Sequence, residues 1–192
     1  MSEPVAEFRP RQALQQRVTT AIVDAAARVL ADRGEHASMA DVAVAAGVAR
    51  ATVYRYFPNR EALLAELARR AVDEAGSRLA SARVADVRAE DGVARAVRAL
   101  TEVGDAFVVV ARERVRPVPD QFERAVAQPL RRLFEKGQAE GTIRSDVPSS
   151  LLVEGLLGVA AGALTATPAM GREDAIAATT RLFLDGARRG AA

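Results

Sequence analysis

The 192-residue sequence contains no cysteine, one histidine and one lysine. Without cysteine the protein has no disulfides, no thiol catalysis and no cysteine-ligated zinc, which is compatible with a reducing compartment. The single histidine, His36, falls in an expected loop with no second ligand type nearby, which is typical of a surface residue. Because a convergent set of catalytic groups is missing, the sequence predicts no catalytic residue, no metal site and no cofactor.

Aromatic residues are also scarce, at 4%, whereas apolar residues reach 49% and alanine is abundant. This balance favours helices over sheet. The longest apolar run, Gly155 to Ala166, is too short for a bilayer span, which needs about 20 residues. No basic segment followed by an apolar run occurs at the N-terminus, so no signal peptide and no membrane partner are expected. The sequence therefore predicts a soluble, cytoplasmic protein.

The net charge of +2 is unevenly distributed along the chain. From Arg9 to Arg60 there are eight arginines and four acidic residues, whereas residues 61–192 hold 19 basic and 19 acidic residues. Arginine suits bidentate contacts with guanine and phosphate. The N-terminal third is therefore the expected nucleic-acid-binding end.

The stretch from Ser38 to Glu61 has the pattern of two short helices that meet at a glycine. Ser38 and Asp41 stand three residues apart, a spacing at which a hydroxyl and a carboxylate can cap a helix start. Gly47 can adopt a positive φ and close the turn after this helix. A second helix is expected from Ala49 to Tyr56. Together these features predict a helix-turn-helix that docks on DNA.

The outward face of the second helix carries the side chains expected to contact DNA, while Val53 is its inward anchor. Guanidinium groups suit guanine edges and phosphates, and hydroxyl groups suit phosphate oxygens. Asn59 is expected to cap the next helix, whose start suits a phosphate. From periodicity alone, a helical hairpin with a solvated basic face stays open as an alternative. The candidate DNA-binding residues are Arg50, Thr52, Tyr54, Arg55, Tyr56 and Arg60.

The segment AGVARATVYRYFPNREALLAEL, residues 46–67, resembles the DNA-binding signature of the TetR family of bacterial transcriptional regulators. The resemblance covers roughly residues 17–67. It implies that Arg50, Thr52 and Tyr54 contact DNA from the recognition helix and that Tyr56 and Arg60 contact its backbone. The sequence departs from the family where Ala49 replaces a common Ser or Thr, which removes a side-chain cap and a hydroxyl.

The resemblance implies an all-α homodimer that binds a palindromic double-stranded DNA operator and releases it when a small effector binds. In the expected arrangement, a three-helix helix-turn-helix domain is joined by a long fourth helix to a C-terminal helical domain for ligand binding and dimerisation. The predicted boundaries are a flexible arm at 1–12, the DNA-binding domain at 13–60, and the effector-binding and dimerisation domain at 61–192.

Apolar periodicity predicts the helices around and beyond the helix-turn-helix. A helix containing Val18 to Leu30 should end at Gly34. A long helix from Asn59 to about Ala82 would link both domains and transmit effector binding to DNA, with Gly76 as a weak point. A charged loop, Arg83 to Asp91, is the expected domain boundary. Further helices are predicted at 92–103, 105–112, 120–138, 148–167 and 173–188, with Pro129 either kinking the third of these or marking its true start.

The effector pocket is implied by the resemblance to lie among residues 92–167, and the apolar balance favours a lipophilic ligand. Each inward-facing candidate is also compatible with a role in the core. The candidate effector-binding residues are Phe107, Arg112, Phe122, Val126, Leu130, Phe134, Glu154 and Leu157.

The last two predicted helices are the expected homodimer interface. Gly155, Gly158 and Gly162 fall on one side of the first of them, which lets a partner helix approach closely. An intramolecular helix pair remains open as an alternative. Two rival functions also remain: a DNA-binding protein whose C-terminal domain only dimerises or binds a protein partner, and an enzyme with a helical fold.

Overall fold

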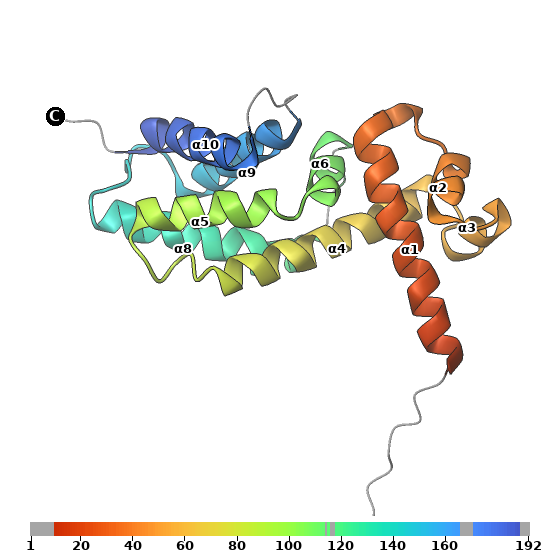
Figure 1. Ribbon diagram of the computed structural model, residues 1–192. Helices are drawn as coiled ribbons and strands as arrows, with labels where there is room; N and C mark the ends of the chain where they lie inside the picture. Colours follow the sequence, from red (N-terminus) through yellow and green to blue (C-terminus); the bar gives the residue numbers. More distant parts are fainter. Residues whose placement is uncertain (1–9, 114, 116–117, 166–170, 189–192) are drawn as a thin grey trace, which may run out of the picture. The chain divides into compact units, whose positions relative to one another are not determined.

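The computed structural model describes residues 10–113, 115, 118–165 and 171–188, and these residues are almost entirely helical (Figure 1). Within these ranges there is no β-strand, only one isolated antiparallel bridge between Ile143 and Arg188. The chain divides into two compact units, residues 1–67 and 68–192. The predicted all-α fold is therefore confirmed.

The N-terminal unit is built on three helices and the first turns of a fourth. Its core is a set of fully or nearly fully buried apolar side chains, and α1 packs on α2, which packs on α3. The elements are α1 (Pro10–Arg33), a 3-10 turn (Gly34–His36), α2 (Met39–Ala46), α3 (Arg50–Tyr56) and α4 (Arg60–Ser81). The core residues are Ile22, Ala25, Ala26, Leu30, Val42, Ala43, Val53, Leu63 and Leu67.

Two predicted boundaries differ from the structure. The arm was predicted over residues 1–12, but α1 already begins at Pro10, and the remainder of the arm lies outside the described residues. Proline is favoured at the first helical position because its φ is already helical and its missing N–H has no role there. The division between units falls after Leu67, inside α4, later than the predicted end of the DNA-binding domain at residue 60 and before the loop at 83–91, because Leu63 and Leu67 are buried in the N-terminal unit.

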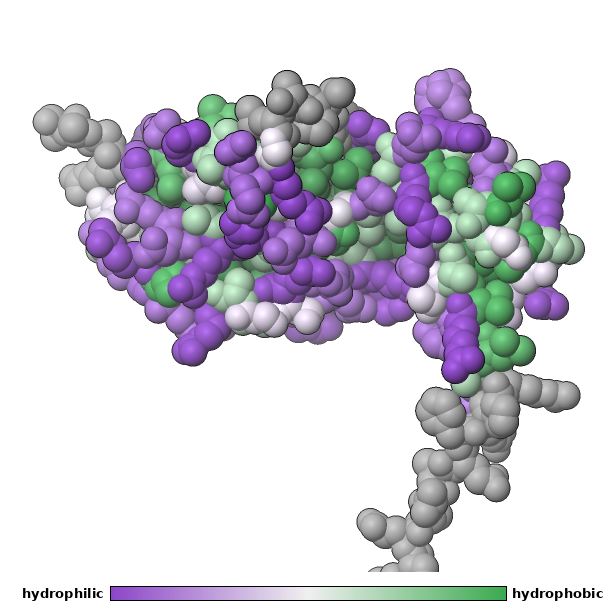
Figure 2. Space-filling view, viewed as in Figure 1, coloured by the Kyte–Doolittle hydropathy of each residue, from purple (hydrophilic) through white to green (hydrophobic). Residues whose placement is uncertain are grey.

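The C-terminal unit is a bundle around one continuous hydrophobic core. In it α5 packs against α8, α9 and α10, and α9 packs against α6, α8 and α10 (Figure 1). The rings of Phe134 and Phe183 pack together in this core, with centroids 5.7 Å apart. Hydrophilic side chains cover most of the visible face of this unit in Figure 2. Its elements are the rest of α4, then α5 (Ala89–Thr101), α6 (Asp105–Arg112), α7 (Pro119–Phe122), a π-helical turn (Glu123–Ala127), α8 (Gln128–Ala139), α9 (Ser149–Thr165) and α10 (Arg172–Ala187).

Pro129 has the effect that its chemistry predicts. Proline lacks an N–H and its ring clashes with the carbonyl four residues earlier, here that of Ala125. The chain avoids this clash by widening into the π-helical turn Glu123–Ala127, and α8 starts at Gln128 with the proline in its first turn. The Gln128 N–H donates to the Glu123 carbonyl, five residues back, as a π turn requires.

Candidate functional site

The turn between α2 and α3 forms as its residues predict. The Ser38 N–H donates to Asp41 Oδ2 (2.8 Å) and the Asp41 N–H donates to Ser38 Oγ (3.2 Å), which completes a capping box. At the other end of α2, Gly47 has φ +66° and its N–H donates to the Val44 carbonyl (3.1 Å). A side chain other than glycine would be strained in this left-handed conformation. The predicted cap and turn are both confirmed.

Helix α3 presents one buried and one exposed face. Val53 is fully buried, whereas Arg50, Tyr54 and Arg55 are exposed and Thr52 and Tyr56 are half-buried. Its first turn lacks a side-chain cap, because Ala49 precedes it. Three candidate DNA-binding residues thus form one exposed surface of this short helix.

Each exposed arginine of α3 lies over a tyrosine ring. The Arg50 guanidinium carbon is 5.3 Å from the Tyr54 ring centroid, and its Nη2 donates to Tyr54 Oη (3.3 Å). The Arg55 guanidinium carbon is likewise 5.3 Å from the ring centroid of Tyr56. Cation–π contacts of this kind restrict long side chains while leaving guanidinium N–H groups able to donate.

The start of α4 is held by two side chains. Asn59 Oδ1 accepts the Ala62 N–H (2.8 Å), so the predicted cap is confirmed. Arg60 donates from Nη1 to the Ala37 carbonyl (2.6 Å) and from Nη2 to the Gly34 carbonyl (3.3 Å). This guanidinium therefore ties α4 to the connection that precedes α2, a role that its position in the sequence did not reveal. Its contact with phosphate remains a prediction.

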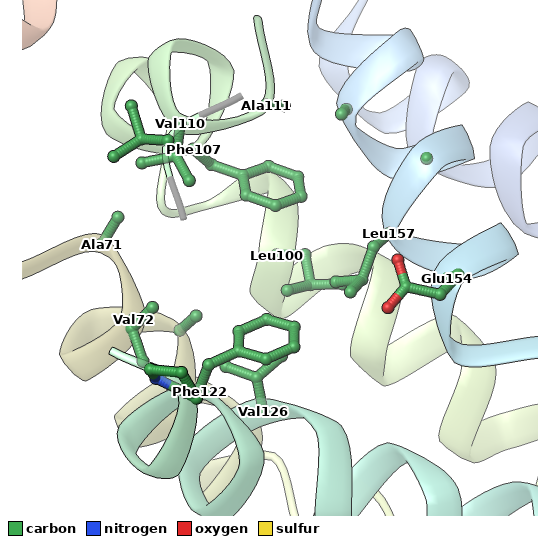
Figure 3. A pocket seen from close by; sticks show the side chains of 15 residues that line it. Ala71, Val72, Leu100, Phe107, Val110, Ala111, Phe122, Val126, Glu154 and Leu157 are labelled. Carbon is green, nitrogen blue, oxygen red and sulfur yellow. The ribbon is translucent and has the colours of Figure 1, made fainter. Parts of the chain in front are cut away.

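The C-terminal unit contains a cavity of about 740 Å³ (Figure 3). Ligand pockets commonly fall in the range of roughly 300–1,000 Å³. Figure 3 shows Phe107 and Val110 of α6 on one side, Phe122 and Val126 on the opposite side, and Leu157 of α9 between them. The described lining residues are Ala71, Val72, Ala75, Leu100, Phe107, Val110, Ala111, Val115, Pro119, Phe122, Val126, Glu154, Leu157, Gly158 and Ala161.

The cavity includes some of the predicted effector-binding residues and not others. Phe107, Phe122, Val126, Glu154 and Leu157 line it. Leu130 and Phe134 are instead fully buried in the hydrophobic core, and Arg112 is exposed and outside the lining. Leu130 and Phe134 follow Val126 at helical spacing, so all three lie on one apolar face. Periodicity alone could not show that Val126 lines the cavity whereas Leu130 and Phe134 lie in the core.

The wall formed by α4 was missing from the predicted effector-binding residues. Ala71, Val72 and Ala75 line the cavity from this helix. Their helical spacing marked an apolar face but not the space that this face adjoins. The same helix begins in the N-terminal unit and therefore carries residues of both units.

The segment that contributes Pro119, Phe122 and Val126 to the cavity lining is anchored to α4. Gln121 Nε2 donates to Asp73 Oδ1 (2.6 Å) and to the Arg69 carbonyl (3.3 Å). One turn further, the backbone of α4 at Gly76 lies so close to Ala125 that an added Cβ would be 2.8 Å from the Ala125 Cβ. Gly76, predicted only as a weak point of α4, is required for this close approach.

Helices α9 and α10 expose an apolar face within the isolated chain. Leu151 and Leu182 are 59% and 68% exposed, and Gly155, Gly158 and Gly162 are exposed as well. A Cβ added at Gly158 or Gly162 would meet no atom within 4 Å. A Cβ added at Gly155 would instead be 3.7 Å from Phe183 Cε2 of α10, and α9 packs against α10 within the chain, so the intramolecular pairing that the sequence left open is present beside this exposed face.

The described residues contain no group of three His, Asp or Glu residues able to hold a metal ion. They also contain no helix that is long and apolar enough to cross a membrane.

Comparison with known proteins shows similarity to bacterial regulators. Residues 22–67 match the family model "Bacterial regulatory proteins, tetR family". The curated HTH-type transcriptional repressor LfrR of Mycolicibacterium smegmatis is 36% identical over 96 residues, which is 50% of each protein. The chain thus spans about half the length of the curated relative that it matches.

Solved structures resemble the chain over most of its length. LfrR from Mycobacterium smegmatis in complex with proflavine has a TM-score of 0.67 and 25% identity, covering 91% of this chain and 99% of that one. AibR in complex with isovaleryl coenzyme A and operator DNA has a TM-score of 0.67 and 22% identity, with coverages of 86% and 97%. A tetR-family regulatory protein from Rhodococcus reaches a TM-score of 0.73 at 16% identity, with coverages of 91% and 99%. At these lower identities the last two similarities concern the fold alone.

Proposed function

We propose that the chain is a transcriptional repressor of the TetR family of bacterial regulatory proteins, which binds a palindromic operator as a dimer and is released by a small lipophilic effector. The observation that carries this proposal is the exposed face of α3 in the part of the chain that matches the family model. The rival enzyme is set aside because the relatives are named as regulators of transcription.

The DNA contacts are assigned to α3 and the start of α4. Arg50, Thr52 and Tyr54 read or brace the operator in the major groove, with Arg55 beside them. The stacking of Arg50 on Tyr54 reduces the freedom that this side chain loses when it binds a base edge. Tyr56 and Arg60 contact phosphates, and Arg60 in addition holds the α1–α2 connection.

A dimer is proposed on physical grounds. One short recognition helix reads too few base pairs for selectivity, whereas two copies about 34 Å apart read two half-sites in successive major grooves. The exposed apolar face of α9 and α10 is the surface proposed to join the two copies. Small residues there permit close helix packing.

The effector is proposed to bind in the cavity of the C-terminal unit. The volume and apolar lining favour this over the alternative of a C-terminal domain that only dimerises or binds a protein. A ligand that presses on Ala71, Val72 or Ala75 acts on α4, whose first turns carry Leu63 and Leu67 of the N-terminal core. This shared helix is the proposed route by which the effector lowers DNA affinity.

Selection of genomic DNA fragments by the purified protein, followed by sequencing, tests the proposal. The salt concentration is held constant because phosphate contacts make affinity steeply salt-dependent. We expect recovery of one palindromic site, and its loss from the bound fraction when a lipophilic metabolite library is added. Uniform, salt-sensitive recovery of all fragments would contradict the recognition-helix assignment.

A further inference from the structure

The cavity of the C-terminal unit is apolar except at Glu154. Among the lining residues that the structure describes, this is the only one with a charged side chain. Figure 3 shows its carboxylate directed from α9 toward the space between the Phe107 and Phe122 rings. A ligand in this cavity therefore meets hydrocarbon on most sides and a single negative charge on one.

Nothing in the described part of the chain neutralises this charge. No hydrogen bond or ion pair joins the Glu154 side chain to another described residue. Arg131 shares a smaller hollow with Glu154, but both of its Nη groups donate to Glu123, at 2.8 and 3.1 Å. The Glu154 side chain is exposed, so water solvates its carboxylate before a ligand enters.

A ligand that fills the cavity removes water from this carboxylate, so the charge of the ligand decides the energetic outcome. A neutral ligand leaves the carboxylate partly desolvated without a partner, and an anion adds repulsion. A cation compensates the charge, and the faces of Phe107 and Phe122 attract a cation through their quadrupoles. We propose that the effector of this protein is a lipophilic organic cation and that Glu154 selects it. This inference rests on the proposed function in one respect, that the cavity is the effector site.

Tetraphenylphosphonium and tetraphenylborate are suitable probes because they have nearly the same shape and opposite charge. Calorimetric titration of the full chain is expected to give an affinity at least tenfold higher for the phosphonium than for the borate, roughly the effect of one partly solvated charge pair. Equal affinities, tighter binding of the borate or binding of neither ion would overturn the inference.

Variants then test whether Glu154 is responsible. Glu154→Gln keeps the shape of the side chain and should weaken phosphonium binding about tenfold and remove the preference over borate. Glu154→Asp keeps the charge and should retain the preference. Glu140→Gln makes the same charge change at an exposed residue outside the cavity and should leave both affinities unchanged. Thermal melting checks that all three variants fold.

The two proposals fail in different ways. Undiminished phosphonium binding by a folded Glu154→Gln variant would overturn the role of Glu154 without affecting operator recognition. If the phosphonium binds through Glu154 but leaves the operator complex intact, the proposal that a ligand in this cavity releases DNA is wrong. The binding of lipophilic cations through Glu154 would then still hold. Fluorescence anisotropy of labelled operator DNA, measured with and without the phosphonium, distinguishes these results.

Discussion

At the scale of single residues, short-range hydrogen bonds determine the shape of the helix-turn-helix. Ser38 and Asp41 cap α2, Gly47 closes the turn and Asn59 caps α4. Each acts within three or four residues of its own position. The face of α3 left exposed by these contacts is the one proposed to meet DNA.

The Ser38–Asp41 cap should make the stability of the protein depend on acid. Hydrogen bonds from the Ser38 side chain and backbone, followed by the charge of Arg33, hold the pKa of the Asp41 carboxyl below its ordinary value. A lowered carboxyl pKa contributes stability above the ordinary value and loses it as the pH falls through the folded-state pKa, below roughly pH 4. Urea unfolding should show that Asp41→Asn is less stable than wild type at pH 7, with the difference narrowing toward pH 3. A stability difference between the two proteins that does not change with pH would show that the charge of Asp41 does not contribute to stability.

Arg50 should contribute to sequence recognition more than to general DNA affinity. We expect Arg50→Ala to lower affinity for the operator by about tenfold or more, the loss typical of a bidentate base contact, and to affect random DNA much less. Arg132→Ala, which removes the same charge from an exposed position on α8, serves as the control. Equal losses on both DNAs in a binding assay at constant salt would reduce Arg50 to a phosphate contact.

Tyr56 is expected to behave differently from Arg50. If its hydroxyl donates to phosphate, Tyr56→Phe should weaken binding to operator and random DNA by similar factors. The ring that lies beside Arg55 is retained in this variant, so the comparison isolates the hydroxyl. A loss restricted to operator DNA, in the same assay, would contradict the phosphate assignment.

At the scale of elements, α4 and the π-helical turn both line the cavity, and they are in direct contact with each other. Pro129 creates the π turn, and Gly76 lets the widened backbone approach α4. Gln121 fixes the preceding turn to Asp73. The cavity therefore lies beside a close backbone contact, where a small displacement of either segment must move the other.

Gly76→Ala should destabilise the protein despite the higher helix propensity of alanine. The new Cβ would be 2.8 Å from the Ala125 Cβ and 3.2 Å from its carbonyl oxygen, and overpacking of this kind costs roughly 1–3 kcal/mol against a propensity gain of about 1 kcal/mol. Chemical denaturation of both single variants and of Gly76→Ala/Ala125→Gly completes a double-mutant cycle. Additive effects would indicate that the two positions do not press on each other.

At the scale of the whole molecule, α9 and α10 carry an apolar face that remains exposed to solvent in a single chain. Leu151 and Leu182 are exposed there, and a Cβ added at Gly158 would meet no atom within 4 Å. A surface of this kind on a regulator is consistent with the proposed dimer, since dimer interfaces are apolar and closely packed.

Charge placed on this face should separate the two copies. We expect Leu151→Glu combined with Leu182→Glu to shift the mass measured by light scattering from dimer to monomer and to lower operator affinity at the same protein concentration. Leu14→Glu, at an equally exposed leucine of α1, should leave the mass unchanged. A dimeric double variant would place the interface elsewhere.

The sequence by itself determined the features that depend on near neighbours along the chain. The helix-turn-helix with its caps, the exposed side chains of α3, the bounds of α6 and the consequence of Pro129 all follow from residues within about five positions of each other. The family resemblance likewise rested on one continuous segment. Such features are predictable because local sterics and hydrogen bonds decide them.

Only the tertiary structure decided the features that depend on distant residues. It brought α4, α6, α7 and α9 around one cavity, assigned Leu130 and Phe134 to the core, and directed Arg60 to carbonyls more than twenty residues away. It also placed the boundary between units after Leu67, inside α4. Periodicity identifies which side chains avoid water, but only the packing of distant helices determines whether these side chains meet a core or a cavity.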